Sequence, residues 1–153
     1  MSFPGKGSTI GQTVSAPRVL APADIALLAA MNIPAVTVTR RPDIALISTG
    51  DELVMPGEDP GPDQIIASNH AGIAALVEDC GGEPLDLGIS PDDPMALAGH
   101  VRDAITGKAD ILVTLGGASV GDHDLVQEVL GQEGMDLAFW RIAMRPGKPL
   151  MAG

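Results

Sequence analysis

The residues best suited to chemistry lie in a glycine-rich stretch that follows an apolar run, residues 111–115. Asp110 and a glycine pair bound the run, which predicts a buried strand. Apolar residues at helical spacing from Leu125 onward predict a helix that begins at about Asp122. Glycine backbone and the free N–H groups of a helix start form an anion site, to which Ser119 adds a hydroxyl. A tight strand-to-helix turn with Asp122 as N-cap is an equally good interpretation.

Acidic residues beside this turn, and after a second apolar strand, favour a metal ion. Asp122 and Asp124 lie at the predicted helix start, and Asp51 and Glu52 follow the apolar run 44–47. Mg²⁺ typically binds one or two carboxylates together with water and phosphate oxygens of a substrate. These acids therefore predict a magnesium site for a phosphorylated ligand, or a general base. Turn formation and solvation are the alternative interpretation.

Two further segments supply polar groups. Lys148 lies in a rigid Pro-Gly-Lys-Pro turn, where it is a point cation for a phosphate or an oxyanion. Arg145 could hold such a group through two parallel hydrogen bonds. A surface hairpin is the alternative for both residues. Ser68 and Asn69 either bind ligand or cap a long helix that ends at about Cys80.

The histidines and the single cysteine give weaker signals. His70, His100 and His123 lack the spacing of a metal site, and the sequence shows no Ser–His–Asp nucleophile arrangement or cysteine-based zinc pattern. Cys80 lies in an apolar helical pattern with Ile73, Leu76 and Val77, which predicts a core thiol. One cysteine forms no intramolecular disulfide, which is compatible with a cytoplasmic protein.

Composition excludes several classes of partner. The chain of 153 residues carries 9 Lys and Arg against 20 Asp and Glu, a net charge of −11. Nucleic-acid binding needs a basic surface, and single strands also need aromatic stacking, whereas aromatic residues are 2% of this chain. No apolar run approaches the length of a membrane span, and the N-terminus lacks the apolar core of a signal peptide. We therefore expect no nucleic-acid partner and no membrane partner.

The order of elements predicts the fold. Residues 1–21 form a weakly structured lead-in, residues 22–41 a helix and a strand at 36–38, and residues 42–153 an α/β domain. In that domain strands alternate with helices, which predicts a three-layer αβα sandwich with a mostly parallel sheet. Ligands of such folds bind beyond the carboxyl ends of the strands. The turns 48–52, 116–124 and 145–148 each follow a predicted strand, so a shared edge would make them one site.

These motifs resemble a known family. Ser-Thr-Gly-Asp-Glu-Leu at 48–53, Ser68-Asn69, Gly-Gly-Ala-Ser-Val-Gly at 116–121 with Asp124, and Arg-Pro-Gly-Lys-Pro at 145–149 are similar to the MogA-like, molybdopterin-binding domain of molybdopterin molybdenumtransferases, the MoeA and gephyrin E-domain family. The resemblance runs from about Ala21 to the end. The Pro-Gly-Lys-Pro turn favours this branch over the MogA/MoaB adenylyltransferases. Ala118 and Arg145 depart mildly from the pattern, where valine and lysine are common.

The resemblance implies an enzyme that takes adenylylated molybdopterin and molybdate, with Mg²⁺, inserts molybdenum into the dithiolene and releases AMP. Family members carry further domains, so we expect this chain to be one domain of a longer protein that forms a homo-oligomer. The resemblance implies that Asp51, Asp124 and Lys148 are catalytic, and that Asp51, Glu52 and Asp124 bind the metal. It implies binding of pterin or phosphate by Thr49, Gly50, Glu52, Ser68, Asn69, Gly116, Gly117, Ser119, Gly121 and Arg145.

Two other functions are compatible with the sequence. One is a binding module that holds the pterin without turnover. The other is a nucleotide pyrophosphatase of the competence-damage type, against which the Pro-Gly-Lys-Pro turn argues.

Overall fold

The computed structural model describes residues 14–116, 125–144 and 149–153, apart from the side chains of Trp140, Arg141 and Pro149. The chain divides into two compact units, Met1–Arg40 and Arg41–Gly153, and each is described by itself. Within the described ranges, no helix is both long and apolar enough to cross a membrane.

The described part of the N-terminal unit contains the helix α1 (Pro22–Ala30). Pro22 begins the helix, where a missing backbone N–H has no cost, and Asn32 follows its end with φ of 58°. Asp24 accepts a hydrogen bond from the backbone N–H of Ala21 at 2.9 Å and pairs with Arg18 at 2.9 Å. The predicted start and end of this helix are confirmed.

The strand predicted at residues 36–38 is wrong, because the backbone of residues 33–42 forms no strand. Its valines and threonines are typical of strands, but a strand also needs a hydrogen-bonded neighbour. Residues 36–39 instead line a hollow of about 770 Å³ within this unit, together with residues 14–20 and Leu28.

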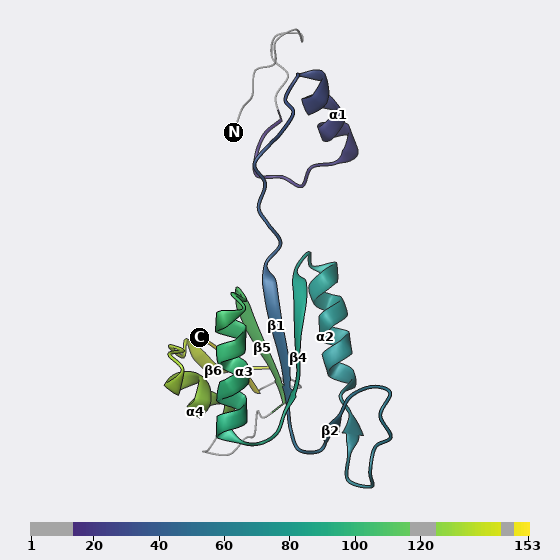
Figure 1. Ribbon diagram of the computed structural model, residues 1–153. Coiled ribbons are helices and arrows are strands. Elements are labelled where there is room, and N and C mark those ends of the chain that lie inside the picture. The colour runs from purple at the N-terminus through teal and green to yellow at the C-terminus, as the bar shows by residue number, and fades with distance from the viewer. Residues whose placement is uncertain (1–13, 117–124, 145–148) are drawn as a thin grey trace. The chain divides into compact units, whose positions relative to one another are not determined.

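A three-stranded parallel sheet is the centre of the second unit (Figure 1). The strand β1 (Asp43–Thr49) lies between β4 (Glu83–Ser90) and β5 (Ile111–Gly116) and is parallel to both. Every residue of β1 after Asp43 is buried. A continuous apolar run of this kind is typical of a parallel strand that is covered on both faces.

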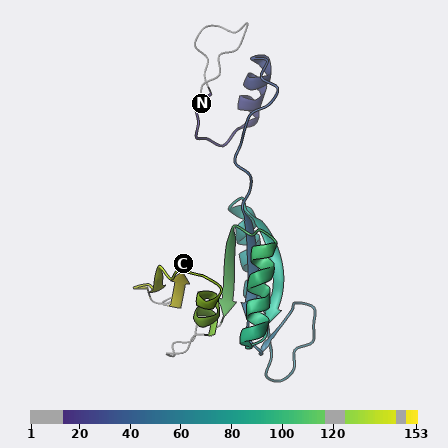
Figure 2. The same cartoon turned by 60° about the vertical axis from the view of Figure 1, so that its left-hand side comes forward.

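Helices cover both faces of this sheet, as Figures 1 and 2 show. Successive side chains of a strand point to opposite faces. Ile47 belongs to a buried cluster with side chains of α3 (Pro94–Thr106) and α4 (Leu125–Gln132), whereas Ser48 contacts α2 (Ser68–Asp79). The predicted three-layer α/β fold with a parallel sheet is therefore confirmed.

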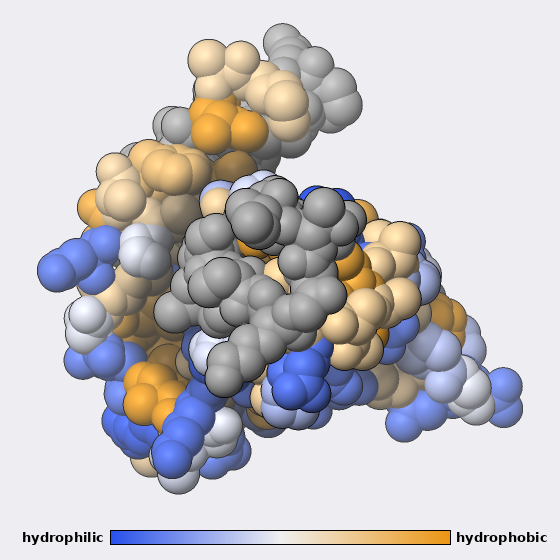
Figure 3. Space-filling model, turned by 90° about the horizontal axis from the view of Figure 1, so that it is seen from above, coloured by the Kyte–Doolittle hydropathy of each residue, from blue (hydrophilic) through white to orange (hydrophobic). Residues whose placement is uncertain are grey.

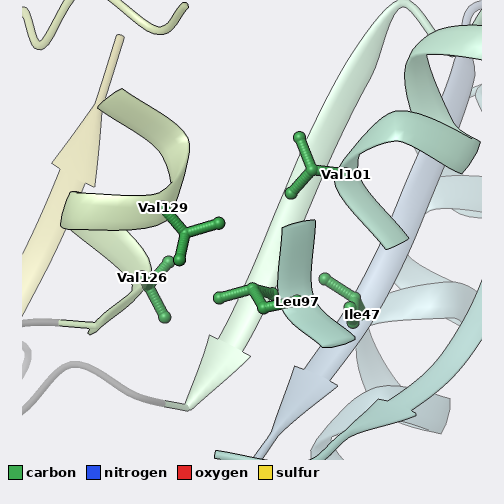
Figure 4. Close-up of a cluster of buried hydrophobic side chains, with 5 residues drawn as sticks. All are labelled: Ile47, Leu97, Val101, Val126 and Val129. Carbon is green, nitrogen blue, oxygen red and sulfur yellow. The ribbon is translucent and has the colours of Figure 1, made fainter. Parts of the chain in front are cut away.

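The hydrophobic core on the α3 face consists of Ile47, Leu97, Val101, Val126 and Val129, each at most 4% exposed. Figure 4 shows Val126 and Val129 of α4 pointing toward Leu97 of α3. The helix α3 begins where predicted. Its N-cap is Asp93, which accepts a hydrogen bond from the backbone N–H of Ala96 at 2.7 Å.

A surface ion pair also joins α3 to the chain after α4. Arg102 Nε lies 3.0 Å from Oε2 of Glu133. The hydrogen bond and the charge of Glu133 raise the pKa of Arg102, so the guanidinium remains charged at any physiological pH.

Two smaller sheets accompany the central one. The strands β2 (Leu53–Val54) and β3 (Ile65–Ile66) are parallel, and β6 (Phe139–Arg141) and β7 (Pro149–Ala152) are antiparallel. The strand predicted over 137–144 is thus shorter than expected. Large hydrophobic side chains are exposed here and elsewhere, and Figure 3 shows them beside hydrophilic residues on the face that it draws.

Two expectations for α2 are wrong. The N-cap of α2 is Ala67 and no side chain caps it, so Ser68 and Asn69 belong to the first turn of the helix. Cys80 is exposed and Leu76 is 54% exposed, so neither lies in the core. The inward stripe of α2 contains His70, which is 4% exposed, together with the half-buried Ile73 and Val77.

The pairing of β1 with β4 contains one irregularity. Leu46 lies opposite Asp86, whereas Ser48 lies opposite Ile89, so β4 has one extra residue between these pairs. This is the arrangement of a β-bulge, in which a glycine often takes a positive φ. Gly88 has φ of 76°, and its N–H donates to Oδ1 of Asp86 at 2.7 Å.

Gly116 closes β5 where it approaches β1. Its φ is 98°, and a Cβ at this position would lie 2.4 Å from the carbonyl oxygen of Thr49. No rotation of a side chain relieves a clash with backbone, so this close approach requires glycine.

Leu97→Ala should lower the free energy of unfolding by about 2–5 kcal/mol, because it leaves a cavity beneath a fully buried side chain. Urea denaturation followed by circular dichroism measures this change. Met95→Ala on the same helix is the control, since Met95 is 84% exposed and should change stability by no more than about 0.5 kcal/mol. Equal effects of the two substitutions would contradict the described core.

Gly116→Ala should destabilise the unit more than Gly134→Ala. The two glycines have φ of 98° and 103°, but a Cβ at Gly134 meets no atom within 4 Å. Both variants therefore bear the strain of positive φ, about 1–2 kcal/mol, and Gly116→Ala adds the clash with Thr49. Urea denaturation of the pair compares them, and equal losses would show that β5 does not approach Thr49 as described.

Candidate functional site

The carboxyl ends of the three central strands meet at one edge of the sheet. Thr49 of β1 lies opposite Ser90 of β4 and Gly116 of β5. The turn that begins at Ser48 and the glycine-rich stretch that begins at Gly116 therefore leave the same edge. Ligands of parallel α/β sheets bind beyond this edge, so both motifs begin where a site is expected.

The side-chain hydroxyl of Thr49 is buried at this edge without a partner among the described residues. The residue is 3% exposed, and its Oγ1 has no hydrogen-bond partner among the described residues. A buried hydroxyl without a partner has a cost of about 1–3 kcal/mol. Such a group calls for an explanation, and a bound ligand or ion that supplies the missing hydrogen bond is one.

The turn after β1 places two carboxylates at the edge. The N–H of Gly50 donates to the carbonyl oxygen of Ser90 at 3.2 Å, which continues the pairing beyond the strand. Asp51 and Glu52 are exposed. Asp51 Oδ1 accepts a hydrogen bond from the N–H of Asp92 at 3.0 Å, so this carboxylate also holds the loop before α3.

The start of α2 is tied to the same region. The N–H of Ala67 donates to the carbonyl oxygen of Val54 at 2.9 Å, and the N–H of Ile65 donates to that of Glu52 at 2.8 Å. Ser68 and Asn69 follow immediately and are exposed. Neither capping role is observed, so their predicted binding role is the interpretation that stays open.

His70 is a residue of this region that the sequence did not single out. Its Nδ1 lies 3.0 Å from Oγ of Ser48, and its Nε2 lies 2.9 Å from Oδ1 of Asp86 without the alignment of a hydrogen bond. The structure thus brings a serine, a histidine and an aspartate together. Ser48 is 2% exposed, and unlike the hydroxyl of Thr49 its hydroxyl already has a partner, Nδ1 of His70.

One signal in the sequence could have found His70. The residue is three positions before Ile73 and seven before Val77, so it shares the helix face that these apolar residues present to the sheet. A histidine on an inward face needs a buried polar partner. Its partners are 22 and 16 residues away in sequence, and only the folded chain identifies them as Ser48 and Asp86.

The other predicted site residues lie outside the described residues. They are Gly117, Ser119, Gly121, Asp124, Arg145 and Lys148, together with Asp122 and His123. The roles predicted for them, and for the residues at the edge, stay predictions. Among the residues that the structure describes, no group of three or more acidic, histidine or cysteine side chains could hold a metal ion.

A family model described as "Probable molybdopterin binding domain" matches residues 45–153. The chain is 47% identical over 128 residues to the molybdopterin molybdenumtransferase of Nostoc sp., covering 84% of this chain and 29% of the relative. It is 37% identical over 134 residues to the molybdopterin molybdenumtransferase of Haemophilus influenzae, covering 88% of this chain and 33% of the relative. The chain therefore spans about a third of the length of these relatives.

Solved structures agree with the sequence comparison. A molybdopterin biosynthesis MoeA protein from Pyrococcus horikoshii superposes with a TM-score of 0.72 at 35% identity, over 86% of this chain and 32% of the other. A further solved structure, of a molybdopterin biosynthesis MoeA protein from Pyrococcus horikoshii OT3, gives a TM-score of 0.71 at 27% identity, over 97% of this chain and 35% of the other. On sequence and on fold, the chain belongs to the family of molybdopterin-binding domains that its longer relatives, the molybdopterin molybdenumtransferases, contain.

Proposed function

We propose that the carboxyl edge of β1, β4 and β5 binds molybdopterin in its adenylylated form, as a step of molybdenum cofactor biosynthesis. The observation that carries this proposal is the buried hydroxyl of Thr49, which lacks a partner among the described residues, beside the close approach of Gly116. A polar ligand at this edge would supply the missing hydrogen bond. Membership of the molybdopterin-binding family supports the identity of that ligand.

In this proposal, residues at the end of β5 and after it hold the phosphate of the pterin. Gly116 and Gly117, with Gly121, allow the backbone to approach an anion closely, and Ser119 adds a hydroxyl donor. Lys148 and Arg145 supply positive charge for a phosphate or an oxyanion. Cations are needed here, because the chain as a whole carries a net charge of −11 and does not attract an anionic ligand.

Mg²⁺ fits the donors at this edge. Asp51 and Glu52 are exposed carboxylates at the end of β1, and hard cations prefer such oxygen ligands. In the proposal Asp51, Glu52 and Asp124 hold the ion. When bound, Mg²⁺ would neutralise phosphate charge at the edge. Asp51 has a second task, because its bond to the N–H of Asp92 fixes the loop that leads into α3.

The relatives are named as enzymes. In our proposal, the longer protein inserts molybdenum from molybdate and releases AMP. This chain spans about a third of those relatives. We therefore propose that these 153 residues bind the pterin without complete turnover. A nucleotide pyrophosphatase is less well supported, since the relatives that match the chain are named molybdopterin molybdenumtransferases.

The setting of this function is also part of the proposal. We propose that the full-length protein is a cytoplasmic homo-oligomer whose partner is a small phosphorylated pterin. The acidic balance of the chain supports the absence of a nucleic-acid partner, and one cysteine in 153 residues suits a reducing compartment.

Asp51→Asn should weaken the binding of molybdopterin in the presence of Mg²⁺ by about tenfold or more, the scale on which groups around a metal site change metal affinity. Isothermal titration calorimetry with and without Mg²⁺ measures this effect. Without Mg²⁺ the variant should bind no more weakly than the wild type, because the amide keeps the shape of the carboxylate and removes a negative charge beside the phosphate.

Asp79→Asn is the matched control. Asp79 is exposed and ends the same helix that Ser68 begins. Asp79 lies eleven residues along the helix from Ser68, a distance of about 16 Å from the start of α2. The control should bind as the wild type does. If Asp51→Asn binds as tightly as Asp79→Asn with Mg²⁺, the metal role of Asp51 is wrong.

A further inference from the structure

The contacts of His70 join three elements of the second unit. The imidazole belongs to the first turns of α2, Ser48 belongs to the end of β1, and Asp86 belongs to β4. His70 and Ser48 are 4% and 2% exposed, whereas the side chain of Asp86 is 57% exposed. The cluster therefore runs from the core beneath α2 to the surface at Asp86.

The chemistry of the partners orients the imidazole. A carboxylate only accepts hydrogen bonds, so Asp86 favours the proton on Nε2 of His70. With the proton of the neutral ring on Nε2, Nδ1 carries a lone pair, and the hydroxyl of Ser48 would be the donor of their 3.0 Å hydrogen bond. Asp86 is itself oriented by the N–H of Gly88, which donates to its Oδ1 at 2.7 Å. This order of partners resembles the way that a carboxylate orients a metal-ligating histidine.

The position of Ser48 connects this cluster to the proposed site. Thr49 and Gly50 follow Ser48 directly, and His70 comes directly after Ser68 and Asn69. The hydrogen bond between His70 and Ser48 therefore links two segments through their side chains. One is the segment that follows β1, and the other is the first turn of α2. A shift of this link would move Thr49 and Gly50 relative to Asn69.

We propose that His70 is a positioning residue that fixes the end of β1 against the first turn of α2 through its Nδ1 contact with Ser48. The contact with Ser48 sets the geometry of the edge, whereas the contact with Asp86 only favours one tautomer and is not required, because a hydroxyl can pair with either form of the ring. The consequence for ligand binding rests on the proposed pterin site, whereas the consequence for the geometry of the edge does not.

Two substitutions at the same position separate the two contacts. Asparagine ends where histidine carries Nδ1, so His70→Asn can keep a hydrogen bond with Ser48 and loses the contact with Asp86. Glutamine extends one bond further, so His70→Gln can reach Asp86 and loses the bond with Ser48. Ser48→Ala removes the same bond from the other side. Asp86→Asn keeps the size of the exposed partner and serves as the control.

The first readout needs no ligand and is amide hydrogen exchange followed by NMR. The N–H of Gly50 donates to Ser90 at 3.2 Å, so its exchange reports on the edge, whereas the amide of Ala45 in the middle of β1 reports on global opening. His70→Gln and Ser48→Ala should accelerate exchange at Gly50 by about tenfold relative to Ala45. His70→Asn and Asp86→Asn should leave the ratio of the two rates close to that of the wild type.

A purely structural role would change both amides together, and that result would overturn the inference. An equal ratio in His70→Gln and in the wild type would overturn it too. The ¹⁵N shifts of the His70 ring give an additional test, because the neutral ring should carry its proton on Nε2. A proton on Nδ1 would contradict the proposed donation from Ser48.

The second readout is calorimetric titration of molybdopterin with Mg²⁺ into the same variants. If the wild type binds, His70→Gln and Ser48→Ala should bind about tenfold more weakly and His70→Asn within about threefold. Equal binding by all variants would overturn the role of His70 in the site and leave the proposed function intact. If the wild type fails to bind while the exchange ratios change as expected, the proposed function is wrong and the positioning role of His70 stands.

Discussion

The burial of β1 on both faces is the constraint on which the rest of the second unit depends. Its backbone is paired on both sides by parallel strands, and its side chains from Ile44 to Thr49 are covered by helices. Apolar residues meet this requirement up to Ile47. Ser48 and Thr49 are polar and equally buried, so each needs a partner inside the fold or from outside it. Ser48 has His70, and the described residues give Thr49 none.

Continuous or capped patterns were the features that the sequence predicted well. The apolar run before Ser48 specified a buried parallel strand, because such a run leaves no face for water. The Asp93–Pro94 pair specified the start of α3, because a cap and a first-turn proline act locally. The strand prediction for residues 36–38 was wrong for the opposite reason. Their side chains favour a strand, but pairing depends on a neighbour that local sequence does not reveal.

The edge of the sheet was predictable, but its chemistry was only partly so. Strand ends of a parallel sheet converge whatever their sequence, so the turns at Ser48 and Gly116 could be expected at one edge. The burial of Thr49 depends on how closely Gly116 approaches it, which is a property of the packed sheet. Ser68 and Asn69 have the composition of a cap, yet α2 begins one residue earlier because Ala67 is held by Val54 of β2.

The extra residue of β4 affects how this chain can change in length. Ile47 faces two residues of β4, one of which is Gly88, and the pairs on either side are already in register. A chain that lacked Gly88 could keep Asp86 opposite Leu46 and Ser90 opposite Thr49. Deletion of one residue at this point therefore leaves the edge of the sheet in place. The twist of β4 can therefore vary here without moving the residues at the carboxyl edge of the sheet.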